Sequence, residues 1–475
     1  MDNKRDYIYY DHTISLCIVC HRRLSAKIIL EQGKVYLTKT CTEHGFQKVL
    51  IATDIEYYKQ IRNYNKASEY PRKPHTKTEF GCPYDCGICP DHEQHSCLTL
   101  IEVTDRCNLT CPTCYASSSP THGRHRTLEE IERMLDAIVA SEGEPDVVQL
   151  SGGEPTIHPE FFRILDIAKT KPIKHLMVNT NGVRIANDPE FAERLAGYMP
   201  DFEVYLQFDS FKPQALVRLR GKDLTEVRRL AIQRLNALNL STTLVVTLQR
   251  GVNDDEIGGI IEYALKQPCV RGVTFQPTQI SGRIEGYQVG VGQRDGHDMA
   301  SEKLTPTEVR QKILKQTDIF QANDLIPVPC NPDALTMAYA LKLAGQVQPL
   351  TRLIDPEVLL NSSKNTIVYE QDATLHSYVM KMFSTGNSPL SATETFNQLL
   401  CCLPNVVAEG LSYNNLFRVI IMNFMDAYDF DVRAIKKSCV HIVDLSGKII
   451  PFETMNLFYR EELRPHLEPL RKETI

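Results

Sequence analysis

The stretch Leu98-Thr-Leu-Ile-Glu-Val-Thr-Asp-Arg-Cys107-Asn-Leu-Thr-Cys111-Pro-Thr-Cys114-Tyr-Ala decides the fold of this chain. Its apolar start predicts a β-strand, and three cysteines follow, separated by three and then two residues. Three thiolates at this spacing can bind three irons of a cubane [4Fe–4S] cluster, whereas electron-transfer clusters take four cysteines. One iron then stays open for a further ligand, as the vacant position of a catalytic zinc does. The alternative is three buried cysteines without a metal.

A second motif lies about forty residues further on, where the apolar run Val147-Val-Gln-Leu150 ends in Ser151-Gly-Gly-Glu-Pro155. The run predicts a second strand. Gly152 and Gly153 allow the backbone to approach a ligand closely, and Glu154 can accept hydrogen bonds from an ammonium group. The motif therefore predicts a ligand site close to the cysteines.

Together the two motifs resemble the radical S-adenosylmethionine (SAM) enzymes. The resemblance implies that SAM chelates the open iron and that the Gly-Gly-Glu-Pro turn binds the amino group of its methionine part. It also implies that SAM is cleaved reductively to a 5′-deoxyadenosyl radical, which abstracts hydrogen from an unactivated C–H bond. Cys107, Cys111 and Cys114 are then the catalytic cluster ligands. Thr113 stands where the family commonly has an aromatic residue, and Tyr115 follows instead.

Strand and helix patterns alternate between residues 98 and 285, which predicts an α/β fold. The expected strands are residues 98–103, 147–150, 175–178, 203–208, 242–248 and 272–275. The resemblance implies a partial (β/α)6 TIM-like barrel with SAM at the carboxyl ends of its strands, where barrels carry their active sites. Asp209 is alternatively a capping or solvated residue, and Asn181 part of a turn. The residues that we expect to bind SAM are Gly152, Gly153, Glu154, Asn179, Asn181, Gln207, Asp209 and Gln249.

Two more cysteine groups precede this core. Cys82, Cys86, Cys89 and Cys97 are four thiolates at short range, which predicts an auxiliary [4Fe–4S] cluster or a tetrahedral zinc or iron site. Earlier, the Cys17-Ile-Val-Cys20 pair and the Cys41-Thr-Glu-His44 segment resemble a zinc-ribbon or rubredoxin-type knuckle for one zinc or iron. His44 is the fourth ligand or, alternatively, a surface residue in the turn with Gly45.

The order of these parts resembles the radical SAM subgroup that contains archaeal tetraether lipid synthases and a relative associated with pterin methylation. This implies C–C coupling of lipid alkyl chains, or alternatively radical methylation of a pterin or another small molecule. A non-catalytic iron–sulfur redox protein is a third hypothesis. The resemblance also implies a further cluster on Cys330 and Cys439, although Glu453 stands where relatives commonly have a cysteine.

Composition sets the remaining expectations. The 475 residues suggest several domains, and we expect them at 1–75 (metal knuckle), 76–97 (four-cysteine motif), 98–285 (radical SAM core) and 286–475 (carboxyl-terminal α+β domain). The net charge of −6 is spread without long blocks, which argues against nucleic acid as a partner. Neither a signal peptide nor a membrane-spanning run is apparent. The 15 cysteines suit a reducing compartment, so we expect a cytoplasmic enzyme, with or without peripheral membrane contact, that is reduced by a flavodoxin or ferredoxin.

Overall fold

The computed structural model describes residues 5–64, 70–285, 293–294, 297–298, 302–329, 331–343, 346–352 and 415–472. Cys330, predicted above as a cluster ligand, lies outside these ranges. No helix in the described ranges is long and apolar enough to cross a membrane.

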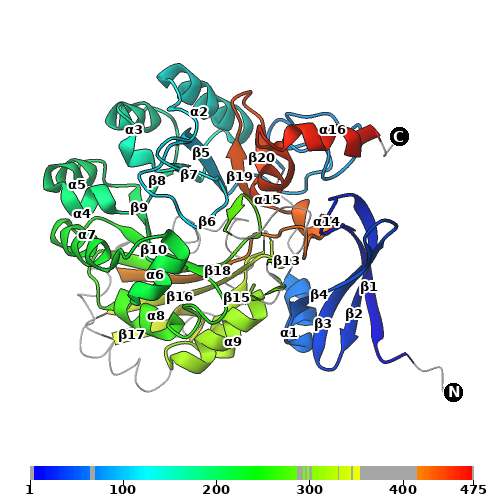
Figure 1. The fold of residues 1–475 in the computed structure, drawn as a ribbon. Helices are drawn as coiled ribbons and strands as arrows, with labels where there is room; N and C mark the ends of the chain where they lie inside the picture. Colours follow the sequence, from blue (N-terminus) through cyan, green and yellow to red (C-terminus); the bar gives the residue numbers. More distant parts are fainter. Residues whose placement is uncertain are drawn as a thin grey trace, which may run out of the picture.

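The centre of the molecule is a curved parallel sheet, visible in Figure 1. Its strands occur in the order β11-β10-β9-β8-β7-β5, and each pairs in parallel with its neighbour. All six predicted strands are present, and the α/β fold class is confirmed. The strands are β5 (Leu98–Thr104), β7 (Val147–Gly152), β8 (His175–Thr180), β9 (Phe202–Gln207), β10 (Thr242–Leu248) and β11 (Val270–Pro277).

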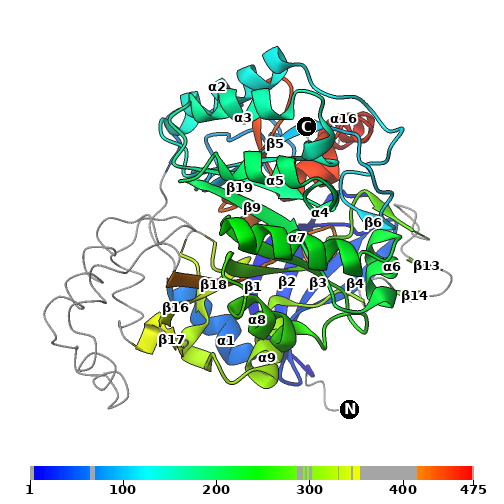
Figure 2. The same ribbon diagram turned by 90° about the vertical axis from the view of Figure 1, so that its left-hand side faces the viewer.

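Helices cover the outer face of this sheet (Figure 2). The longest, α2, begins at the predicted capping box: Thr127 Oγ1 accepts from the Glu130 amide, and Glu130 Oε2 accepts from the Thr127 amide. Its apolar residues Ile131 and Leu135 are fully buried against the strands. The helices are α2 (Leu128–Glu142), α3 (Phe161–Lys169), α4 (Val183–Asn187), α5 (Pro189–Ala196), α6 (Pro213–Arg220), α7 (Thr225–Leu238), α8 (Ile257–Leu265) and α9 (Pro306–Gln316).

Strands from the carboxyl-terminal third extend the core sheet on both sides. β18 pairs in parallel with β11, and β19 pairs in parallel with β5. The sheet therefore runs β15-β16-β18 before β11 and β19-β20 after β5, with β17 beside β16. The elements are β15 (Ile326–Pro327), β16 (Leu335–Leu343), β17 (Gln346–Pro349), β18 (Leu416–Met422), α14 (Val432–Ile435), β19 (Val440–Val443), β20 (Ile449–Pro451), α15 (Phe452–Thr454), η8 (Met455–Tyr459) and α16 (Arg464–Lys472).

The amino-terminal region is a separate antiparallel sheet in the order β1-β2-β3-β4, drawn in dark blue in Figure 1. The buried Lys39 joins this sheet to the rest of the molecule, because its Nζ donates to the carbonyls of Ala427 (2.7 Å) and Tyr428 (2.9 Å). The elements are β1 (Ile8–Leu16), β2 (Arg23–Glu31), β3 (Lys34–Cys41), β4 (Gly45–Ala52), α1 (Ile55–Gln60) and η1 (Ile61–Tyr64).

Short elements complete the described chain, including a two-residue strand in the cysteine loop itself. They are β6 (Thr113–Cys114), η2 (Pro155–Ile157), β12 (Arg283–Ile284), β13 (Gln293–Arg294), β14 (His297–Asp298), η4 (Ala322–Asp324) and η5 (Leu350–Arg352).

Candidate active site and metal centres

The cysteine loop follows β5, the strand at one end of the six parallel strands. It is held in place by residues that follow β11, the strand at the other end. Within the loop, β6 pairs with β12, so that Cys114 faces Arg283. The Arg283 guanidinium donates to the carbonyls of Cys111 (2.7 Å), Ser117 (3.2 Å) and Ser118 (2.5 Å). These contacts fix the loop conformation that directs the three thiols to one place.

The two glycines after β7 permit a close approach to this loop. The Gly153 amide donates to Thr104 O (2.8 Å), and the Glu154 amide donates to Arg106 O (2.9 Å). A Cβ at Gly152 or Gly153 would collide with those same carbonyls, and Gly152 has φ +120°. Glycine is therefore required to bring the turn after β7 against the cysteine loop.

A cavity of about 120 Å³ lies where the two motifs meet, at the carboxyl ends of the strands. Two polar side-chain atoms on its wall, Asn179 Oδ1 and Ser118 Oγ, are buried and lack a hydrogen-bond partner among the described residues. Such atoms suit a site that takes a polar ligand. The predicted site residues on its wall are Cys107, Cys111, Cys114, Gly152, Gly153, Asn179, Asn181 and Gln207.

Glu154 lies just behind this wall and is fully buried. Its carboxylate accepts from Thr156 Oγ1 (2.6 Å), Thr180 Oγ1 (2.7 Å) and the Asn181 amide (2.7 Å). Burial raises the pKa of the Glu154 carboxyl. The hydrogen bonds partly offset this rise in pKa because they stabilise the carboxylate. In the structure, Glu154 therefore connects the turn after β7 to the end of β8, and contact with SAM stays a prediction.

Asp209 does not line the cavity but positions a residue that does. Its carboxylate is fully buried and binds Arg220 through two hydrogen bonds, of 2.7 and 2.5 Å. Arg220 lies on the cavity wall near Cys111. Burial raises the pKa of the Cys111 thiol, and the Arg220 guanidinium opposes that rise because it stabilises the thiolate. Arg220 is thus a residue of the cavity wall that is absent from the site predicted above.

Gln249 also lies away from the cavity wall. Its side chain receives a hydrogen bond from Arg218 (3.5 Å) and donates one to Glu302. The buried amide is thus occupied by contacts between α6 and the segment before α9. Its proposed contact with SAM stays a prediction.

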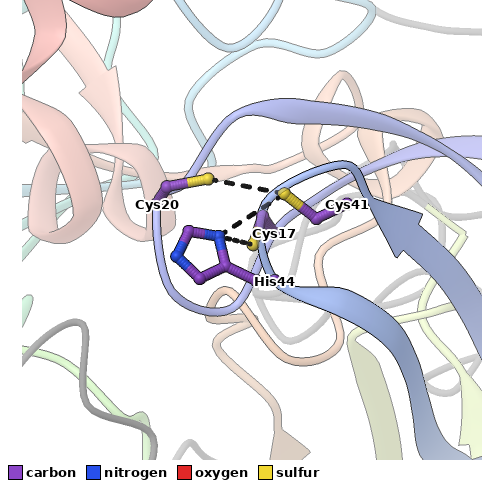
Figure 3. Close-up of side chains that lie close together, drawn as sticks. All are labelled: Cys17, Cys20, Cys41 and His44. Carbon is purple, nitrogen blue, oxygen red and sulfur yellow. Dashed lines mark hydrogen bonds between the residues drawn. The ribbon is translucent and has the colours of Figure 1, made fainter.

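The amino-terminal knuckle brings four potential metal ligands together (Figure 3). Cys17 Sγ and Cys41 Sγ lie 3.6 and 3.5 Å from His44 Nδ1, and Cys20 Sγ lies 3.8 Å from Cys41 Sγ. Tetrahedral zinc with Zn–S bonds of about 2.3 Å and Zn–N bonds of about 2.0 Å has edges of roughly 3.5–3.8 Å. The ligand set therefore fits zinc, and the Nδ1 atom of His44, although the residue is exposed, points toward the sulfurs of Cys17 and Cys41.

The four cysteines before β5 divide into two groups. Cys82, Cys86 and Cys89 line one small cavity together with His92. Cys97 is not on its wall; its Sγ lies 3.6 Å from His95 Nε2 and 3.7 Å from Gln94 Nε2. Cys82, Cys86 and Cys89 thus share one cavity, and an auxiliary metal site on these cysteines and Cys97 stays a prediction.

Of the positions expected to hold a carboxyl-terminal cluster, the structure describes Cys439 and Glu453. Cys439 is buried directly before β19, and its carbonyl accepts from the Leu98 amide (3.1 Å). Glu453 is buried and accepts from Ser438 Oγ (2.9 Å). Burial raises the pKa of the Glu453 carboxyl to about 7. With Cys330 outside the described residues, this cluster stays a prediction.

Comparison with known proteins gives two matching family models. The radical SAM superfamily matches residues 101–264, and the HMPTM N-terminal zinc ribbon domain matches residues 9–53. The first match runs from within β5 to the end of α8 and so covers five of the six parallel strands, and the second covers the sheet that carries Cys17, Cys20, Cys41 and His44.

Curated relatives include one that matches over nearly its whole length. The 7,8-dihydro-6-hydroxymethylpterin dimethyltransferase of Methanocaldococcus jannaschii is 30% identical over 486 residues, which cover 95% of this chain and 94% of that protein. The GTP 3′,8-cyclase of Syntrophomonas wolfei is 30% identical over 192 residues, which cover 39% of this chain and 57% of that protein. Among solved structures, Streptococcus suis SuiB bound to S-adenosylmethionine aligns with a TM-score of 0.33 and 17% identity over 38% of this chain and 40% of that one.

Proposed function

This chain belongs to the family of radical SAM enzymes that includes the 7,8-dihydro-6-hydroxymethylpterin dimethyltransferase of Methanocaldococcus jannaschii, and we propose on that basis that it methylates a pterin. The observation that carries the proposal is the match along 95% of this chain, which includes the zinc-ribbon region as well as the barrel. A shared barrel alone would not indicate a substrate.

The comparison favours pterin methylation, the alternative drawn from the sequence, over coupling of lipid alkyl chains. The cavity wall agrees with this preference, since Asn179 and Gln207 lie on it and the buried Asn179 Oδ1 has no hydrogen-bond partner among the described residues. A lipid chain would leave such buried polar groups without partners, at a cost in binding free energy. A planar heterocycle rich in nitrogen and oxygen atoms can instead form hydrogen bonds with them.

The thiols of Cys107, Cys111 and Cys114 fit a [4Fe–4S] cluster, because they come from one loop and lie on the wall of one cavity. The bound cluster and SAM would supply a radical that removes a hydrogen atom from the substrate. Arg220 would stabilise negative charge at the thiolates, and Arg283 would hold the loop. Gly152 and Gly153 let the turn after β7 lie against the cysteine loop, so that this turn lines the cavity in which SAM would bind.

The proposal is tested by measuring 5′-deoxyadenosine formed by anaerobically reduced, cluster-loaded protein. We expect 7,8-dihydro-6-hydroxymethylpterin to stimulate its formation, whereas a membrane-lipid extract should not. Stimulation by the lipid extract alone would favour alkyl-chain coupling instead. Absence of deoxyadenosine with an intact cluster would favour the non-catalytic redox protein.

A further inference from the structure

The inner face of the barrel carries a single carboxylate in the layer nearest the cysteine loop. Alternate residues of each strand point inward, and on β5 these include Leu98 and Leu100, which pack in the interior cluster. Glu102, two residues after Leu100 on the same strand, therefore also points inward. On the described strands β7 to β11, the inward-pointing residues nearest the carboxyl ends are uncharged: Ser151, Asn179, Gln207, Thr247 and Gln276.

Arg460 orients this carboxylate. Its Nη2 and Nη1 donate to the two oxygens of Glu102, at 2.9 and 3.2 Å, and the side chains of both residues are nearly buried. Arg460 Nε donates to Asn456 Oδ1 (2.9 Å), and Asn456 Nδ2 donates to Gln279 Oε1 (3.0 Å). Hydrogen bonds thus connect β5, through η8, to the segment after β11 and hold the plane of the Glu102 carboxylate.

Glu102 and Arg460 face a hollow of about 610 Å³ beside the SAM cavity. The two spaces share Ala116, Ser118, Gly152 and Gly153 on their walls. The smaller space, about 120 Å³, is well below the 300–1,000 Å³ of ordinary ligand pockets. The larger hollow, whose volume lies within that range, offers the room that a substrate beside SAM needs. Ser118, whose hydroxyl has no hydrogen-bond partner among the described residues, lies on the wall that both spaces share.

We propose that Glu102, oriented by Arg460, recognises the 2-amino-4-oxopyrimidine edge of the substrate; this rests on the proposed function. That edge presents two adjacent donors, N3–H and the 2-amino group. A carboxylate has about four lone-pair positions on two oxygens, so Glu102 retains acceptors beyond those that Arg460 uses. Two parallel hydrogen bonds to an ionised carboxylate are both strong and specific in geometry.

The decisive experiment compares two rings in the E102Q variant. One is 7,8-dihydro-6-hydroxymethylpterin, and the other is its analogue with oxygen in place of the 2-amino group. The substituted side-chain amide would offer one acceptor and one donor, which match the N3–H and the 2-oxo group of the analogue. We expect kcat/KM for the pterin to fall about 100-fold, the effect of losing hydrogen bonds to a charged group, and the preference to shift toward the analogue.

Matched controls separate recognition from folding. E190Q makes the same substitution at an exposed residue of α5, which lines neither space, and should leave turnover of both rings unaffected. E102D retains the carboxylate and should retain the preference for the 2-amino ring, so it carries the test if E102Q fails to bind its metals. Substrate-free cleavage of SAM is measured in wild type and E102Q alongside turnover, because it reports on the SAM site without the substrate ring.

The results that overturn the inference are distinct from those that overturn the function. If wild type turns over the pterin and E102Q keeps the same preference between the two rings, Glu102 is not the recognition residue. Slower substrate-free cleavage in E102Q would assign Glu102 to SAM instead. If the pterin stimulates no turnover in wild type, the proposed function and this inference both fail.

Discussion

At the residue scale, the hydrogen bonds and ion pairs of charged side chains determine the geometry around the three cysteines. Arg283 holds the cysteine loop through three carbonyls. Asp209 holds Arg220 against the cavity, and Arg228 also approaches the same carboxylate (3.5 Å). The spacing of the cysteines identified them as cluster ligands, but no sequence pattern indicated which carboxylate forms an ion pair with which arginine. Several carboxylates and arginines lie at strand ends, and only the folded chain shows which of them meet.

The D209N substitution should be strongly destabilising. Without the carboxylate charge, Arg220 and Arg228 would stay buried without a counter-ion, which costs about 3–5 kcal/mol of unfolding free energy. We expect a lower melting temperature and fewer irons retained per chain. D255N is the matched control, because its ion pair with Lys212 is largely exposed and contributes about 0–1 kcal/mol. Equal melting temperatures for the two variants would contradict this account.

Replacing Cys107, Cys111 and Cys114 together by alanine should abolish the cleavage of SAM. The loss follows from removing all thiolates of the cluster with the open iron. The measurement is 5′-deoxyadenosine by chromatography. C269A is the control, since Cys269 is buried away from the cavity wall and should serve only packing. Continued cleavage in the triple variant would show that another site performs it.

At the element scale, local spacing predicts some parts of the structure better than others. Cys17 and Cys20 lie after β1 and Cys41 ends β3, so the β1–β4 sheet brings a short-range pattern together. The six core strands were predictable because each combines an apolar run with a polar end. The pairing of β18 with β11 and of β19 with β5 was not, because these partners lie far apart in the sequence and no local pattern specifies them.

Removal of the knuckle metal should affect one sheet and spare the barrel. The H44A variant leaves three ligands, which should lower zinc content and loosen β1–β4, because such small sites contribute binding energy to folding. Zinc per chain and proteolysis within residues 5–64 provide the measurement. E43A, an exposed neighbour, is the control. Full zinc content in H44A would exclude His44 as a ligand.

Glu453, at the start of α15, should make stability depend on pH. Its folded-state pKa of about 7 exceeds the ordinary value of 4.5 because the carboxyl is buried. The folded protein therefore binds more protons between pH 4.5 and 7, and stability falls as pH rises through that window, by about 3 kcal/mol. E453Q should raise the melting temperature at pH 8 and leave it nearly unchanged at pH 4.5. No difference between these two pH values would contradict a buried, neutral carboxyl.

At the scale of the whole molecule, the carboxyl-terminal third completes the site. Phe424 and Phe452 line the SAM cavity, and Arg460 reaches Glu102 on the first barrel strand. In this account, substrate selection therefore depends on the carboxyl-terminal third of the chain as well as on β5, the first barrel strand. Sequence motifs identified the enzyme class, whereas the contacts of these segments required the structure.

The number of metals per chain tests the predicted auxiliary site. Two cubane clusters, one on the catalytic cysteines and one near Cys82, Cys86 and Cys89, require about eight irons, together with one zinc in the knuckle. We expect this content after anaerobic reconstitution, measured by elemental analysis. About four irons with two zincs would assign the second site to zinc.

The most direct test of the central claim is mass spectrometry of the pterin after its reaction with the reduced, metal-loaded protein and excess SAM, of which one molecule supplies the radical and another the methyl group. We expect a product heavier than 7,8-dihydro-6-hydroxymethylpterin by one or two methyl groups in place of hydrogen. Its formation should require Cys107, Cys111 and Cys114. An unchanged pterin, from protein that produces 5′-deoxyadenosine and contains its full set of metals, would contradict the account.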